Sequence, residues 1–340
     1  MTVLKAYSFE RGDHMVDDAD CSNPIRVAAS TNYAHTGTYS LRLGGGSTPT
    51  NAWVRYALPG AIANPAISVY CRLNYSYDSN GTGTAYFNIR FRLTTGQYID
   101  LRWNADTHTP DAYVNGVKVA SGTVTVPNNT WFGIQAYMTI SDLGLIQVLV
   151  DGHPSIAVSC DTQPGGAATC DYIYIYGRGV AAVAPSYDYF DDLVIGYGGL
   201  LGPCRCYDMI PDGDTATVQF TPSTGTAHYA MVNETPASDA NYNYTAANGM
   251  TDLLTLSDLN LAGMSIIAVA PWVRALQSEG SGDSITVGVD SGGIESTATY
   301  PLNDSAQYFH HMLNVDPASS LPWSQAGINA LKLLYRSVIS

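Results

Sequence analysis

Charged residues are scarce in this chain, and lysine and glutamate are the scarcest of them. Only 13% of the 340 residues are charged, about half the share found in ordinary globular proteins. Lysine occurs three times and glutamate four times, so arginine supplies 12 of the 15 basic residues and aspartate 25 of the 29 acidic ones. The formal net charge of −14 argues against a protein that wraps nucleic acid or binds an anionic membrane, since both need a basic surface.

Long apolar runs are also missing. No stretch reaches the ~18 apolar residues of a membrane-spanning helix, and the opening MTVLKAYSFERGD lacks the apolar core of a signal peptide. We therefore expect no export through the general secretory route. The number of cysteines is even, but without export it does not establish a disulfide framework. The six cysteines are Cys21, Cys71, Cys160, Cys170, Cys204 and Cys206.

Familiar catalytic motifs are absent from the sequence. There is no Gly-x-Ser-x-Gly elbow, no Cys-x-x-Cys pair and no glycine-rich loop followed by Lys-Ser or Lys-Thr. His310 and His311 are adjacent, so on a strand their side chains would point to opposite faces. These absences lead us to expect a protein that is not an enzyme.

What the sequence does contain is short segments in which apolar and polar residues alternate. In 85–93 (AYFNIRFRL) the residues Phe87, Ile89 and Phe91 share one face and Asn88 and Arg90 the other. A period of two predicts strands with one buried and one wet face. Asn115-Gly116 adds a hairpin turn. The further expected strands are 69–76, 98–103, 134–140, 146–150, 172–176, 190–195, 215–220, 264–270, 284–289 and 308–314.

The chain is long enough for two domains, and the alternation stops between them. Residues 196–206 (GYGGLLGPCRC) are rich in glycine and show no periodicity. The pattern predicts an all-β protein with a first β-sandwich domain over 1–199, a linker over 200–206 and a smaller β-sandwich domain over 207–340. Apolar residues at helical spacing in 323–334 predict one short helix in the second domain.

The first half resembles concanavalin A-like jelly rolls of the laminin G and laminarinase type. The matching stretches are YSFERGD, HTGTYSLRLGG, VPNNTWFGIQAYM, IQVLVDG and YDYFDDLVIG, in that order. The resemblance implies a jelly-roll sandwich for residues 1–199. It does not carry over the family's hydrolase activity, because that needs a Glu-x-Asp-x-x-Glu run and no two glutamates here lie within ten residues of each other.

The second half is similar to segments of structural proteins of tailed bacteriophages. The stretches are MIPDGDTATVQFTPSTGTAHYAMVNE, NYNYTAANGMTDLLTLSDL and NVDPASSLPWSQAGINALKLLYR. This resemblance implies a non-enzymatic protein on the outer surface of the virion, as capsid decoration, head spike or tail component. It also implies assembly in the host cytoplasm, other virion proteins as partners and a homo-oligomer. The alternatives are a lectin-like adhesin of a tail fibre that binds host surface polysaccharide and, less favoured, a glycan hydrolase.

Arginine is concentrated at the polar positions of three successive predicted strands. If these strands are antiparallel neighbours, one sheet face gathers the guanidinium groups beside aromatic rings. Planar guanidinium forks suit carboxylates, so we expect this face to bind an anionic glycan or an acidic protein partner. A solvated face with Arg–Asp pairs is the alternative. The predicted face consists of Arg72, Asn74, Asn88, Arg90, Arg92, Tyr98, Asp100 and Arg102.

The resemblance to jelly rolls also implies a structural calcium ion between the first and last strands. Glu10 lies on the first and Asp192 on the last, and both offer the oxygen ligands that calcium prefers. We expect no other cofactor. The alternative is that both carboxylates face solvent or cap turns.

Overall fold

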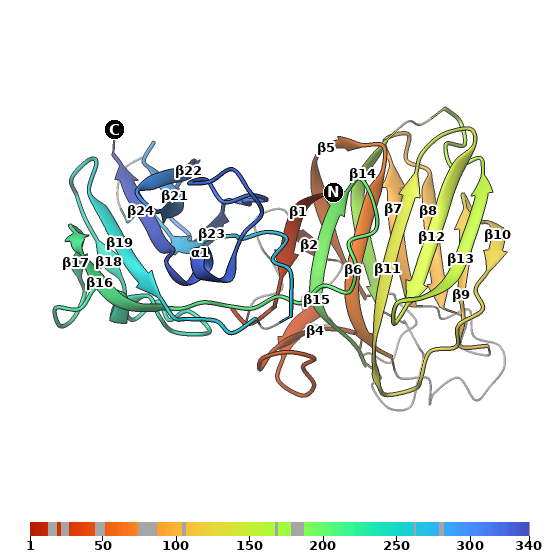
Figure 1. Ribbon diagram of the computed structural model, residues 1–340, viewed down its shortest axis with the longest axis horizontal. Helices are drawn as coiled ribbons and strands as arrows, with labels where there is room; N and C mark the ends of the chain where they lie inside the picture. Colours follow the sequence, from red (N-terminus) through yellow and green to blue (C-terminus); the bar gives the residue numbers. More distant parts are fainter. Residues whose placement is uncertain are drawn as a thin grey trace. The chain divides into compact units, whose positions relative to one another are not determined.

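The structure is a computed structural model. It describes residues 1–12, 19–21, 27–44, 52–73, 87–103, 107–166, 169–177, 187–261, 263–278 and 282–339. The chain is nearly all β, as predicted, and divides into two compact units, Met1–Tyr207 and Asp208–Ser340 (Figure 1). Residues of the expected linker belong to unit 1: Cys204 is buried, and its backbone N–H donates to Ser68 Oγ at 3.2 Å.

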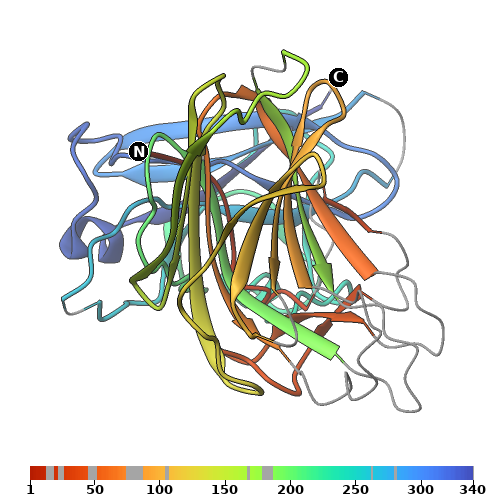
Figure 2. The same ribbon diagram turned by 90° about the vertical axis from the view of Figure 1, so that its right-hand side faces the viewer.

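Unit 1 is a sandwich of two antiparallel sheets, which Figure 2 shows facing each other. Sheet I has the order β13-β12-β11-β6-β15-β4-β3, with β1 also paired to β15, and sheet II has the order β10-β9-β8-β7-β14-β5-β2. The strands of sheet I are β1 (Thr2–Tyr7), β3 (Val27–Ser30), β4 (Ser40–Gly44), β6 (Pro65–Arg72), β11 (Trp131–Thr139), β12 (Gly144–Val150), β13 (His153–Cys160) and β15 (Tyr187–Tyr197). Those of sheet II are β2 (Ala19–Cys21), β5 (Ala52–Ile62), β7 (Phe87–Leu93), β8 (Tyr98–Trp103), β9 (Pro110–Val114), β10 (Val117–Ser121) and β14 (Cys170–Gly177).

The core of unit 1 lies between the sheets and follows from the alternation in the sequence. On β7, Phe87, Ile89 and Phe91 are buried, while the intervening Arg90 points out of the sandwich. The chain crosses repeatedly from one sheet to the other, which makes unit 1 a jelly roll. The Asn115-Gly116 turn joins β9 to β10, and both residues have positive φ angles, as the predicted hairpin requires.

A β-bulge interrupts β15 where it pairs with β6. Phe190 lies opposite Cys71 and Ile195 opposite Ile67, and all four side chains are buried. Between Asp191 and Val194 the register shifts, and Asp192 has a φ of 50°. One extra residue on β15 produces such a shift.

Unit 2 is built on a five-stranded sheet with the order β16-β19-β24-β21-β22. A ribbon of β20 and β23 packs Phe309 against Leu254, Val287 and Leu333 of this sheet. The elements are β16 (Pro211–Val218), β17 (Thr221–Pro222), η1 (Tyr229–Met231), β18 (Asn243–Tyr244), β19 (Thr251–Leu256), β20 (Trp272–Ala275), β21 (Ser284–Ser291), β22 (Ile294–Pro301), β23 (Gln307–His310), α1 (Gln325–Asn329) and β24 (Lys332–Val338).

Two predicted elements of unit 2 were wrong in detail. The short helix ends at Asn329, and Leu334 lies on β24, because the sheet takes up residues whose spacing also fits a helix. Segment 264–270 forms no strand and contributes one isolated bridge, from Val269 to Leu313. Five of the cysteines have free thiols: Cys71, Cys160, Cys170, Cys204 and Cys206. No helix in the described ranges is long and apolar enough to cross a membrane.

Candidate functional site

The outward face of sheet II carries arginine and aromatic side chains in register across its strands. Residues directly opposite each other on antiparallel strands point to the same side. One row therefore contains Arg55, Tyr174, Arg90, Asp100, Tyr113 and Lys118. The flanking rows contain Trp53, Tyr176, Asn88, Arg102 and Asp111 on one side and Tyr172, Arg92 and Tyr98 on the other. We call these residues the arginine–tyrosine face.

Asp100 holds two of the arginines in place. Arg90 donates from Nε and Nη2 to the two carboxylate oxygens of Asp100 at 2.7 and 2.9 Å. Arg102 donates to Asp100 Oδ2 from Nε at 3.2 Å and from Nη2 at 2.8 Å. The Asp100 side chain has no exposed area, whereas those of Arg90 and Arg102 are 26% and 22% exposed. Burial lowers the pKa of Arg90, but the hydrogen bonds and charge of Asp100 outweigh this and raise it overall.

Tyrosine rings lie under the guanidinium groups. The guanidinium carbon of Arg90 is 3.8 Å from the centroid of the Tyr98 ring, and that of Arg102 is 4.2 Å from the Tyr113 ring. Arg55 and Arg92 come from the two strands that flank β14, and their guanidinium carbons lie 4.9 and 5.1 Å from the centroid of the Tyr172 ring. Stacking of this kind fixes the plane of a guanidinium and does not use its N–H groups, which donate along its edge, as those of Arg90 and Arg102 do to Asp100.

The face is positive although the chain is acidic. Its described side chains include four arginines and Lys118 against the carboxylates of Asp100 and Asp111, and Asp171 of β14 lies at its edge next to Arg92. Asp111 pairs with Lys118 at 2.9 Å, and Asp171 lies 3.7 Å from Arg92. With Asp171 included, the described side chains of this region sum to +2, in a protein whose net charge is −14. Such a patch attracts anions.

Two further polar groups lie on the face. Asn88 is 8% exposed, and its side-chain oxygen has no hydrogen-bond partner among the described residues. Burial raises the pKa of Tyr176, and the nearby Arg90 opposes this only in part. The Tyr176 hydroxyl therefore stays protonated.

The structure brings together most, but not all, of the predicted site. Asn88, Arg90, Arg92, Tyr98, Asp100 and Arg102 lie on the arginine–tyrosine face. Arg72 was wrongly grouped with them, because β6 belongs to sheet I, between β11 and β15, and the chain crosses to sheet II before β7. Arg72 instead lies 3.8 Å over the Tyr33 ring and donates to Asn129 Oδ1 at 3.0 Å. Asn74 lies outside the described residues.

Sequence reasoning missed the contribution of β14 and β5. Tyr172, Tyr174 and Tyr176 alternate with isoleucines in YIYIY, a visible signal, but nothing in the sequence says that β14 pairs with β7. Arg55 of β5 was missed for the same reason, because a β5–β14 pair is separated by more than a hundred residues.

The two carboxylates of the predicted calcium site bind the same loop at different points. Glu10 accepts from the backbone N–H groups of Thr38 and Tyr39 at 2.7–2.9 Å. Asp192 accepts from His35 Nδ1 at 2.7 Å and from the Thr36 hydroxyl at 2.8 Å. The described residues contain no group of three or more His, Cys, Asp or Glu side chains arranged to hold a metal. A calcium ion there stays a prediction, which calcium titration followed by thermal unfolding tests.

Beside Asp192 lies a second buried carboxyl group. Asp191 accepts from the backbone N–H groups of His35 and Thr36 at 2.8 and 3.1 Å and from that of Asp192 at 2.8 Å. Burial, and then the charge of Asp192, raise the pKa of Asp191 to about 8, against the opposing effect of these hydrogen bonds. The pair anchors the 35–39 loop to β15.

Comparisons with known proteins give similarity only at the level of structure. No protein-family model matches the chain, and no curated protein matches it in sequence. An alginate lyase is 11% identical and covers 52% of this chain and 86% of its own, with a TM-score of 0.40. The endo-β-1,4-glucuronan lyase of the fungus Trichoderma reesei is 12% identical and covers 55% of this chain and 94% of its own, with a TM-score of 0.41. The catalytic domain of a glycoside hydrolase family 131 protein from Coprinopsis cinerea is 12% identical, covers 58% and 95%, and has a TM-score of 0.38.

These comparisons correct the expected function. The proteins named above are enzymes that act on glycans, not virion components. The prediction of a non-enzymatic structural protein of a phage virion is therefore contradicted, as is the prediction that the chain is not an enzyme. Similarity this distant carries no argument about substrate, so the role of this chain has to be derived from its own residues.

Proposed function

We propose that this protein binds an acidic polysaccharide on the arginine–tyrosine face of sheet II. The observation that carries the proposal is the concentration of four arginines and five tyrosines on one sheet face of a chain that is otherwise acidic. Guanidinium groups bind carboxylates through paired hydrogen bonds, and tyrosine rings present apolar area for the faces of sugar rings at a low entropic cost.

The geometry of the face suits an extended polymer. Arg55 and Arg90 lie in one row, separated by β14, so their backbones are about 9.6 Å apart at the usual spacing of strands. A polysaccharide that crosses the strands meets a guanidinium at each of these two points and a tyrosine ring between them. Asp100 keeps Arg90 and Arg102 in one orientation before the ligand arrives, which lowers the entropy that binding has to overcome.

The experiment measures binding of the full chain to polygalacturonate and to its fully methyl-esterified form, which has the same backbone without the charge. We expect retardation in affinity gels containing the acid but not the ester. The variant Arg55→Ala/Arg92→Ala removes two guanidiniums that flank Tyr172 and leaves Asp100 and its partners intact. Because a charge-assisted hydrogen bond contributes about 1.5–3 kcal/mol, and these groups are partly exposed, we expect binding to weaken by about tenfold.

A matched control uses the other sheet. Arg42→Ala/Arg72→Ala makes the same change in charge and residue type on β4 and β6 of sheet I, so its affinity should equal that of the wild type. Equal weakening by both double variants would mean that only net charge matters and would reject the proposed face. The chain length of the polymer, measured before and after incubation, separates binding from cleavage at the same face.

A further inference from the structure

Unit 2 presents two neighbouring tyrosines to solvent. Tyr242 and Tyr244 flank Asn243 at β18, and each has 52% of its surface exposed. Their ring centroids are 6.0 Å apart, and the ring planes meet at 59°. The ring of a tyrosine is apolar and is usually packed against other side chains, while its hydroxyl contacts water or a hydrogen-bond partner. Two of them held side by side in solvent form a small aromatic platform.

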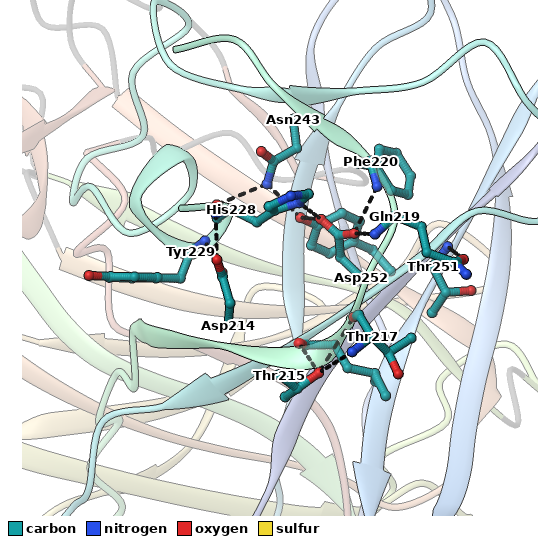
Figure 3. A network of polar contacts seen from close by, with 12 residues as sticks. Asp214, Thr215, Thr217, Gln219, Phe220, His228, Tyr229, Asn243, Thr251 and Asp252 are labelled. Atoms are coloured by element: carbon teal, nitrogen blue, oxygen red, sulfur yellow. Dashed lines mark hydrogen bonds and ion pairs between the residues drawn. The ribbon is translucent and has the colours of Figure 1, made fainter. Parts of the chain in front are cut away.

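The segment beneath this platform is fixed by hydrogen bonds on both sides. Tyr242 and Ser223 are joined by two hydrogen bonds: the Tyr242 N–H donates to Ser223 Oγ at 3.1 Å, and the Ser223 N–H donates to the Tyr242 carbonyl at 2.8 Å. Asn243 points inward, as Figure 3 shows, and donates to the His228 carbonyl at 2.9 Å and to the Tyr335 hydroxyl at 2.7 Å. Asp239, which precedes this segment in the chain, accepts two hydrogen bonds from Arg274, at 2.9 and 2.8 Å.

The groups that hold Asn243 are themselves held by a buried carboxylate (Figure 3). Asp252 has no exposed area and accepts from Tyr335 Oη at 2.7 Å and His228 Nδ1 at 2.9 Å. It also accepts from the backbone N–H groups of Gln219 and Phe220 at 2.6 and 3.0 Å. The tyrosines therefore project from a backbone that is anchored to the core, which preorganises them for contact with a ligand.

The charge of unit 2 defines which ligand the platform suits. Between residues 208 and 340 the sequence has three basic residues and 13 acidic ones. All three basic residues are in ion pairs: Arg274 with Asp239, Lys332 with Asp290, and Arg336 with Glu295. The acidic residues would repel a carboxylated or sulfated ligand, and each basic side chain already pairs with a carboxylate of the protein. Two hydroxyl residues lie beside the tyrosines: Thr221 is opposite Tyr244, and Ser223 is hydrogen-bonded to Tyr242. The amide of Asn241 donates to the Glu234 carboxylate.

We infer that Tyr242 and Tyr244 form a second binding site, which takes a neutral polysaccharide. The apolar C–H faces of uncharged pyranose rings stack on the two tyrosines, and the sugar hydroxyls bond to the hydroxyl groups of Thr221 and Ser223. This site differs from the arginine–tyrosine face in ligand class and in unit, and does not depend on it.

The test compares the full chain with Tyr242→Ala/Tyr244→Ala in affinity gels containing hydroxyethyl cellulose, galactomannan or mixed-linkage β-glucan. We expect the wild type to be retarded in at least one of these gels and the double variant to bind about tenfold more weakly, the effect of losing two aromatic contacts. Tyr242→Phe/Tyr244→Phe keeps the rings and should retain most of the binding. Tyr33→Ala/Tyr207→Ala removes two other exposed tyrosines, which are 45% and 41% exposed, and should bind like the wild type.

Three results would overturn the inference: no retardation of the wild type in any of the neutral gels, equal binding by wild type and Tyr242→Ala/Tyr244→Ala, or a change in oligomeric state as the only effect of that variant. The last result would mean that the tyrosines contact protein. The tests of the two proposed sites are independent. Arg55→Ala/Arg92→Ala should leave retardation by the neutral polymer unchanged, so either site can be rejected without the other.

Discussion

Replacing Asp100 by asparagine tests whether the arginine–tyrosine face works by orientation or by charge alone. The substitution keeps the size of the side chain, removes the negative charge and leaves Arg90 and Arg102 as neighbouring cations without a shared partner. It also makes the face more positive by one unit. A simple count of charges therefore predicts tighter binding of an acidic polysaccharide. If orientation matters, binding weakens, because the guanidinium groups are no longer held in place.

The loss of stability expected for Asp100→Asn follows from how deeply the side chains of Asp100, Arg90 and Arg102 are buried. Breaking a fully buried ion pair costs about 3–5 kcal/mol. Arg90 and Arg102 are 26% and 22% exposed, so water compensates part of this loss, and we expect about 2–3 kcal/mol. For a unit of this size each kcal/mol lowers the Tm by about 2–4 °C, so the midpoint should fall by about 4–12 °C.

The assay is affinity electrophoresis with polygalacturonate at a temperature well below both midpoints, so that only folded protein is compared. We expect Asp100→Asn to bind about fivefold more weakly than the wild type, corresponding to about 1 kcal/mol. Asp171→Asn is the matched control, because it adds the same charge to the face from a carboxylate 3.7 Å from Arg92 that holds no pair of arginines. It should bind at least as tightly as the wild type. If Asp100→Asn binds more tightly, by as much as Asp171→Asn does, the orientation argument is refuted.

Two further predictions concern the loop that joins β3 to β4. The raised pKa of Asp191, about 8 against an ordinary value near 4, means that the folded protein retains a proton that the unfolded chain loses. Stability should therefore fall as pH rises between those values, by up to about 1.4 kcal/mol per pH unit. Asp191→Asn should flatten the plot of Tm against pH from 5 to 8, and an unchanged slope would contradict the assignment. Gly37 has a φ of 62°, and a Cβ there would lie 2.4 Å from the Glu10 carboxylate. Urea unfolding of Gly37→Ala should show a loss of about 1–3 kcal/mol, and an unaltered midpoint would show that the loop moves aside.

The alternating strands were predictable from the sequence because burial on one face imposes a period of two. The β7 and β8 segments show this, since each inward position carries a large apolar residue. The region around β24 was harder, because Ile328, Leu331 and Leu334 fit a helix as well as a strand. Only the pairing of β24 with β19 and β21 decides the matter, and that pairing joins residues far apart in the sequence.

The candidate site could be predicted only where it is local. Arg90, Arg92, Asp100 and Arg102 come from one hairpin, β7 and β8, so sequence neighbours become spatial neighbours. Arg72 and Arg55 show the limit of this reasoning: the first was wrongly included and the second was missed. Which strand enters which sheet depends on the crossings of the jelly roll, and no local pattern records them.

The bulge in β15 makes the length of that strand a condition for the core of unit 1. Five steps along β15, from Phe190 to Ile195, span the same distance as four steps along β6, from Cys71 to Ile67. On a regular strand, five steps would put Phe190 and Ile195 on opposite faces, and the extra residue of the bulge is what keeps both side chains buried. Deleting either Asp191 or Asp192 would leave four steps on both strands, so Ile195 would still face inward, and the loss would be one member of the buried acid pair. A one-residue insertion that adds to the bulge has the opposite effect, because it turns the rest of β15 over and exposes Ile195. The middle of β15 therefore tolerates the loss of its extra residue better than the gain of another.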